Sequence, residues 1–73
     1  MKIYRIKIGI FYAQAILISA DIPHIRFVLT PDIDEAGIYE EDKARFYYKE
    51  LKNDEELKNS GLEIILEEVI KSE

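Results

Sequence analysis

The single histidine, His24, is the residue most suited to acid–base chemistry near neutral pH. A histidine that acts as a general base needs a nucleophile or an orienting carboxylate beside it. Asp21 is three residues away and could reach it, but Ser19, Ser60 and Ser72 lie in no nucleophile motif such as G-x-S-x-G. We therefore expect His24 to be structural or solvated, and we expect no catalytic residue.

Two runs of carboxylates, residues 40–42 and 54–56, are the other groups that could carry chemistry. Paired carboxylates hydrolyse glycosides only within a cleft that raises the pKa of one of them. Both runs come where we expect helices to begin, and acidic side chains there interact favourably with the helix dipole. We expect solvated helix starts. The alternative is an acidic surface that recognises a basic patch on another protein.

The acidic stretch DIDEAG resembles the start of a calcium-binding EF-hand loop. Asp32 and Asp34 match its first and third positions, and Gly37 matches the sixth, where the loop turns sharply. Ala36, at the fifth position, has no side-chain oxygen. Lys43 stands at the twelfth, where calcium requires a bidentate carboxylate. We expect a solvated acidic turn and no metal site.

The positions of the glycines and the lack of cysteine exclude further kinds of functional site. Gly9, Gly37 and Gly61 are far apart and none precedes a G-K-[ST] sequence, so no phosphate-binding loop is predicted. The sequence contains no cysteine, which excludes disulfides, zinc fingers, iron–sulfur sites and thiol catalysis. We expect no cofactor, and the chain is predicted not to be an enzyme.

Length and charge narrow the possible partners. The 73 residues form one predicted domain, residues 1–73, and a chain this short buries only about 60% of its unfolded surface. Residues 34–73 carry thirteen acidic and six basic side chains, a net charge of −7, and residues 1–33 carry +2, which gives −5 for the whole chain. Such a charge repels nucleic acid.

The apolar stretch 8–20 is too short to span a bilayer, and we expect a cytoplasmic protein without membrane contact.

Three adjacent aromatic residues, Phe46, Tyr47 and Tyr48, cannot all point the same way. On a helix the two tyrosines join the buried stripe, and Phe46 lies about 100° away from it. One interpretation is that the ring lies on the surface, covered by the aliphatic stems of Arg45 and Lys49. The other is that it belongs to an interface, where aromatic residues are enriched.

The N-terminal third is predicted to be strands. In residues 2–8, Tyr4, Ile6 and Ile8 fall on one side and Ile3, Arg5 and Lys7 on the other, which indicates a half-buried strand. Residues 11–19 are apolar on both sides and suit a central strand covered on two faces, with a buried helix as the alternative. Residues 24–30 fit a strand and a helix equally well.

The second half shows helical spacing. Residues 40–52 place Ala44, Tyr47, Tyr48 and Leu51 on one side of a helix. Residues 62–72 repeat such a stripe, and Ser60 with Glu63 would form a capping box. We therefore expect a helix there, although β-branched residues leave a strand open as the alternative.

These patterns predict an α+β fold, in which two or three N-terminal antiparallel strands pack against one or two C-terminal helices. The function we expect is a small acidic protein-interaction module, of inhibitor or regulator type. It would bind another protein, with a basic patch as one option, through an aromatic–acidic surface. The expected partner-binding residues are Phe46, Tyr47, Glu41 and Asp42.

The alternative function is a self-associating domain, a homo-oligomer and most simply a homodimer, with a structural role. The chain is rich in apolar residues for its size, which favours burial against a second copy. Ile3 and Ile64 would then lie at a two-fold interface.

Overall fold

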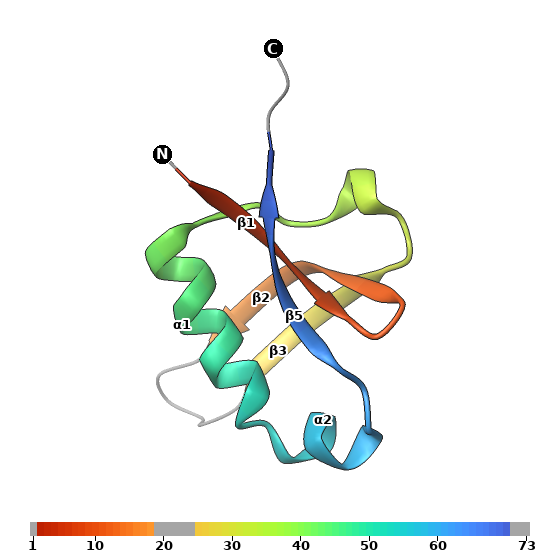
Figure 1. The fold of residues 1–73 in the computed structure, drawn as a ribbon. Coiled ribbons are helices and arrows are strands. Elements are labelled where there is room, and N and C mark those ends of the chain that lie inside the picture. Colours follow the sequence, from red (N-terminus) through yellow and green to blue (C-terminus); the bar gives the residue numbers. More distant parts are fainter. Residues whose placement is uncertain (1, 19–24, 71–73) are drawn as a thin grey trace.

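The computed structural model describes residues 2–18 and 25–70. They form a small α+β fold in which an antiparallel five-stranded sheet packs against two α-helices (Figure 1). The strands are β1 (Ile3–Ile8), β2 (Phe11–Ile18), β3 (Ile25–Thr30), β4 (Tyr39–Glu40) and β5 (Ile64–Val69). The helices are α1 (Glu41–Lys52), α2 (Glu55–Ser60) and a 3-10 turn, η1 (Ile33–Glu35).

Strand β1 is the centre of the sheet. Along one side it pairs over its whole length with β5, from Ile3 opposite Val69 to Ile8 opposite Ile64. Its other side is shared, because the short strand β4 pairs with the beginning of β1 and the start of β2 pairs with its end. Strand β2 therefore pairs with β1 only over its first two residues.

The predicted alternation of the first strand is confirmed. Tyr4, Ile6 and Ile8 are buried, whereas Ile3, Arg5 and Lys7 on the opposite face are only partly covered. Ile6 and Ile8 are completely inaccessible to solvent and form the core with Ala13, Ile16, Leu51 and Leu57.

A two-residue turn joins β1 to β2. Ile8 pairs with Phe11, and Gly9 between them has a φ of +62°. A positive φ at the first central residue alone is characteristic of a type II′ turn, which suits hairpins and favours glycine at that position.

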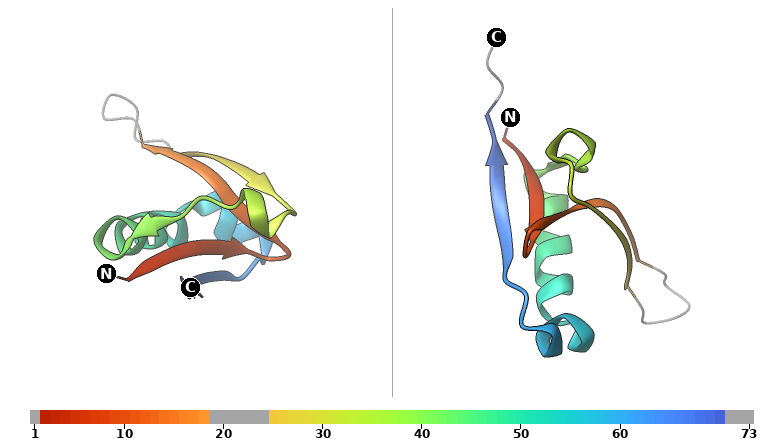
Figure 2. Two further views of the ribbon diagram at one scale, coloured as in Figure 1. Left: turned by 90° about the horizontal axis from the view of Figure 1, so that it is seen from above. Right: turned by 90° about the vertical axis from the view of Figure 1, so that its right-hand side faces the viewer.

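Strands β2 and β3 form a hairpin that swings away from β1 and β5 (Figure 2). The strand prediction for residues 11–19 is confirmed over 11–18, and the open question at residues 24–30 is resolved as a strand over 25–30. The prediction that both faces of β2 are covered was wrong for this single chain, because four side chains of the strand are exposed: Gln14, Ala15, Leu17 and Ile18.

Helix α1 confirms the prediction for residues 40–52 and packs on β1 and β5 (Figure 2). Ala44 and Leu51 of the predicted stripe are buried, and Tyr47 and Tyr48 are half-buried. A second, shorter helix follows. The carboxylate of Asp54 accepts a hydrogen bond from the Leu57 amide at 3.1 Å, which caps the N-terminus of α2.

The helix predicted for residues 62–72 was wrong, and the strand alternative is correct for the described part, as β5. Ser60 caps no such helix, because it ends α2 and its hydroxyl donates to the Leu57 carbonyl at 2.6 Å. The reason is tertiary. β1 offers a full-length edge, and alternate residues Ile64 and Leu66 then face the core. The sheet accordingly has five strands rather than two or three, and its last strand is C-terminal.

The acidic stretch after β3 forms the 3-10 turn η1. The Asp32 carboxylate accepts a hydrogen bond from the Asp34 amide at 2.9 Å, and no residue of η1 is buried. Within residues 2–18 and 25–70, no group of three or more potential metal-ligating side chains comes together. The prediction for His24, with Asp21 and Ser19, lies outside the described residues. No described helix has the length and apolar character needed to cross a bilayer.

Candidate protein-binding groove

A groove of about 510 Å³ lies between the end of β2 and the first turns of α1. We call it the β2–α1 groove. Strand β2 contributes apolar side chains, and α1 contributes two aromatic rings and two charges. The lining residues are Ile16, Leu17, Ile18, Asp42, Lys43, Phe46 and Tyr47.

The three adjacent aromatic residues have different surroundings. Tyr47 packs against the core, with its ring edge-on to Tyr39 at a centroid distance of 5.1 Å. Tyr48 is half-buried, with the Lys52 ammonium 5.3 Å from its ring centroid. Phe46 stays 51% exposed and lies 6.0 Å from the Tyr47 ring. The expectation that Phe46 leaves the buried stripe is thus confirmed, and the ring lines the β2–α1 groove.

The groove exists because β2 diverges from β1. Only Phe11 and Tyr12 of β2 pair with β1. Beyond them, the Gly37 amide donates a hydrogen bond of 2.9 Å to the Ala13 carbonyl. A β-bulge between Ala13 and Ala15 follows. Bulges bend a strand, and the bend here carries the rest of β2 away from β1.

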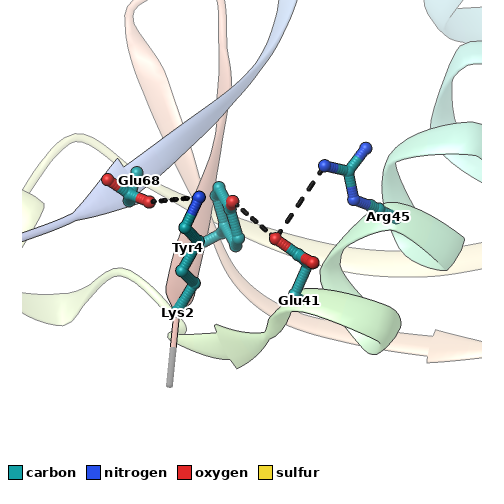
Figure 3. Close-up of polar contacts among 5 residues, drawn as sticks. All are labelled: Lys2, Tyr4, Glu41, Arg45 and Glu68. Atoms are coloured by element: carbon teal, nitrogen blue, oxygen red, sulfur yellow. Dashed lines mark hydrogen bonds and ion pairs between the residues drawn. The ribbon is translucent and has the colours of Figure 1, made fainter.

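Of the four residues expected to bind a partner, three lie together. Phe46, Tyr47 and Asp42 all line the β2–α1 groove, but Glu41 does not. The Glu41 carboxylate instead accepts a hydrogen bond of 2.9 Å from the Tyr4 hydroxyl, and the Arg45 guanidinium lies 3.9 Å from it (Figure 3). Successive helix residues are about 100° apart, which separates Glu41 from its neighbour Asp42.

Polar pairs hold β1 to the elements around it. In addition to the Tyr4–Glu41 bond, the ammonium of Lys2 approaches the Glu68 carboxylate at 3.9 Å (Figure 3). On the opposite face of the sheet, Arg5 forms an ion pair with Glu67 and also lies 5.8 Å from the ring centroid of Tyr12. These contacts explain why two glutamates are tolerated in β5 next to the basic residues of β1.

Two tyrosines should make the protein sensitive to alkali. The hydrogen bond to Glu41, and burial after it, raise the pKa of Tyr4 above its ordinary value of 10.0. Burial, with a smaller effect of Tyr47, raises the pKa of Tyr39 in the same direction. The stabilisation from each group is complete below the ordinary pKa. It is lost as the pH rises through the raised one, because the unfolded chain ionises first.

We therefore expect the free energy of unfolding to fall above pH 10, and Tyr4→Phe to make that fall shallower. Urea denaturation of both proteins across an alkaline pH series measures the two slopes. Tyr39→Phe should reduce the slope independently. Identical slopes for wild type and Tyr4→Phe would contradict the role assigned to the Tyr4–Glu41 bond.

A second hollow, of about 460 Å³, lies on the β2–β3 hairpin and shares Leu17 with the β2–α1 groove. Its lining residues are Ala15, Leu17, Ile25, Arg26, Phe27 and Val28. Leu17 and Val28 are exposed, and sequence reasoning did not select either of them. Residues 11–19 did carry a signal, because a strand that is apolar on both sides must leave one side uncovered wherever no second layer packs against it.

The β2–α1 groove can therefore offer apolar contact area beside one carboxylate and one ammonium group, which suits the noncovalent binding of another chain. The chain matches no family model, no curated protein and no solved structure.

Proposed function

We propose that the protein is a small acidic, non-enzymatic interaction module, of inhibitor or regulator type, that binds another protein in the β2–α1 groove. One observation carries this proposal. Phe46 on α1 and Leu17 on β2, which are 51% and 67% exposed, line the same groove although they are distant in the sequence. Large apolar side chains that gather in a hollow are typical of binding surfaces.

Charge supports a basic partner. The chain carries a net charge of −5, and the Asp42 carboxylate in the groove forms no ion pair with any described residue. Complementary charge accelerates association and selects partners, and salt screens it. Binding should therefore weaken as the ionic strength rises. The sequence contains no cysteine and so no disulfide, which supports a cytoplasmic location, because structural disulfides are rare there.

Phe46→Ala tests the proposal. Full burial of a phenylalanine side chain contributes about 1.5–3 kcal/mol, and binding can bury only the exposed half of Phe46, so its loss should weaken binding about 4- to 13-fold. The thermal midpoint should change little, since the ring is half-exposed. The partner is first captured on immobilised wild-type protein and purified. Its affinity for each variant is then measured by isothermal titration calorimetry.

Ile38→Ala is the matched control, because Ile38 is also about half-exposed, at 55%, but does not line the groove. It should bind the partner as tightly as the wild type does. Equal affinity of the wild type and Phe46→Ala would remove Phe46 from the contact and contradict the proposal.

A second candidate is a self-associating homodimer with a structural role. The observation that favours it is that β2, Phe11–Ile18, contains no charged residue, so two copies could meet there without close repulsion. The two residues expected at this interface, Ile3 and Ile64, lie on opposite faces of the sheet. Ile64 packs against the core, so the two side chains would not belong to one contact surface. Light scattering at increasing protein concentration distinguishes a dimer from a monomer.

A further inference from the structure

We infer that the partner binds as an extended strand, which pairs with residues 15–18 of β2 on the edge opposite β3 and packs its side chains against Phe46. The inference rests on the proposed function and specifies how the β2–α1 groove is used. It also predicts which kind of segment the partner contributes.

The main chain of β2 provides the first reason. Strand β3 pairs with β2 as far as Ile18, which lies opposite Ile25. On the other edge, β1 pairs only with Phe11 and Tyr12. Within the described part of the chain, no strand pairs with residues 15–18 on that edge. Backbone amide and carbonyl groups on such an edge are a template for another strand.

Within the described residues the sheet has open edges at β3, β4, β5 and the end of β2, and these edges differ in how they are protected. Strand β4 has only two residues, one of which is Glu40. Natural edge strands carry charged residues or proline, which oppose pairing with another chain. Strand β5 contains Glu67 and Glu68, and β3 contains Arg26 and is followed by Pro31. Residues 15–18 of β2 contain no charged residue and no proline. This is therefore the edge stretch that the sequence leaves most available for pairing.

The groove beside this edge provides the second reason. An added strand would lie about 4.8 Å from β2, on the side where α1 forms the opposite wall. Side chains of a strand alternate between its two faces. Every second side chain of the partner would therefore point towards α1, where Phe46 and Tyr47 present their rings. Main-chain bonds would then supply affinity and the aromatic rings would supply selectivity.

Charge defines the occupant as a segment of a different protein. A second copy would bring a further −5, whereas a basic segment would be attracted by the net charge of the whole chain. In the groove itself, its cation would pair with Asp42 at a distance from Lys43. The segment that fits has apolar residues at alternate positions, and a lysine or arginine placed to meet the Asp42 carboxylate.

The probe is a peptide selected from a random library displayed on phage, with wild-type protein as the target and Phe46→Ala protein as the counter-target. We expect selected sequences with alternating apolar residues and at least one basic residue. Binding of the synthetic peptide should slow hydrogen exchange at backbone amides within residues 15–18, measured by NMR. N-methylation of the peptide amides that face β2 should weaken binding about tenfold or more, because it removes main-chain hydrogen bonds to β2.

N-methylation of the alternate amides, which face away from β2, is the matched control and should leave affinity nearly unchanged. If both methylated peptides bind as tightly as the parent, and Phe46→Ala still weakens binding, strand pairing is overturned while the proposed function stands. If no selected peptide discriminates against Phe46→Ala, both fail. If the wild type is a dimer whose residues 15–18 are already protected without peptide, the edge belongs to a second copy and the inference is overturned.

Discussion

Ile6→Ala is expected to lower the free energy of unfolding by about 3–4 kcal/mol, which is the largest effect we predict for a single substitution. Ile6 is 0% exposed and lies on β1, the strand that pairs with three others. Truncation would remove apolar contacts and leave a cavity that the paired strands could not close by moving. A chain of this length has a total stability of about 4–11 kcal/mol, so much of it would be lost.

Urea denaturation followed by circular dichroism measures this effect. Ile70→Ala is the matched control, because it makes the same chemical change at a side chain that is 84% exposed, where about 0.5 kcal/mol or less is expected. Similar losses for the two variants would show that β1 is not the structural centre of the fold.

The N-terminal strand could be predicted because its pattern has only one regular solution. Tyr4, Ile6 and Ile8 recur at every second position, and no helix places them on one face. The same reasoning predicted α1, where Ala44 and Leu51 are one heptad apart and are both buried. In these two segments the apolar period and the tertiary structure require the same backbone.

Strand β5 could not be predicted in this way. Residues 62–70 contain apolar residues at helical spacing and also at alternating positions, so the local pattern supports both structures. What decides between them is the unpaired edge of β1, more than fifty residues away in the sequence, as the pairing of Ile8 with Ile64 shows. Long-range pairing of this kind overrides local propensity.

The candidate site could be predicted only in part, because it combines local helix geometry with a long-range arrangement. Helical geometry alone places Phe46 off the buried stripe and separates Glu41 from Asp42. The apposition of Phe46 with Leu17 depends on the bulge between Ala13 and Ala15, which turns β2 away from β1. The sequence around Gln14 contains no glycine or proline that would signal such a bend. The groove therefore becomes visible only in the folded chain.

Gly37→Ala is expected to lower the free energy of unfolding by about 1–3 kcal/mol, the usual range for overpacking a filled site. A Cβ atom at Gly37 would lie 2.5 Å from the Tyr39 hydroxyl oxygen and 2.7 Å from the main-chain carbonyl oxygen of Gln14. Both distances are too short for van der Waals contact. The segment would have to move away from β2, which would strain the 2.9 Å hydrogen bond from the Gly37 amide to the Ala13 carbonyl.

Two further variants separate this clash from other effects of removing a glycine. At Gly61 an added Cβ meets no atom within 4 Å, but φ is +75°, so Gly61→Ala should cost about 1–2 kcal/mol from backbone conformation alone. Adding Tyr39→Phe to Gly37→Ala removes the hydroxyl contact and leaves two close contacts in place, the Gln14 carbonyl oxygen at 2.7 Å and the ring carbon Cζ of residue 39 at 2.9 Å. Chemical denaturation of the double variant, compared with Tyr39→Phe alone, should therefore show only partial recovery. Full recovery would mean that the side chain of Tyr39, rather than the bulged main chain of β2, is what requires glycine at this position.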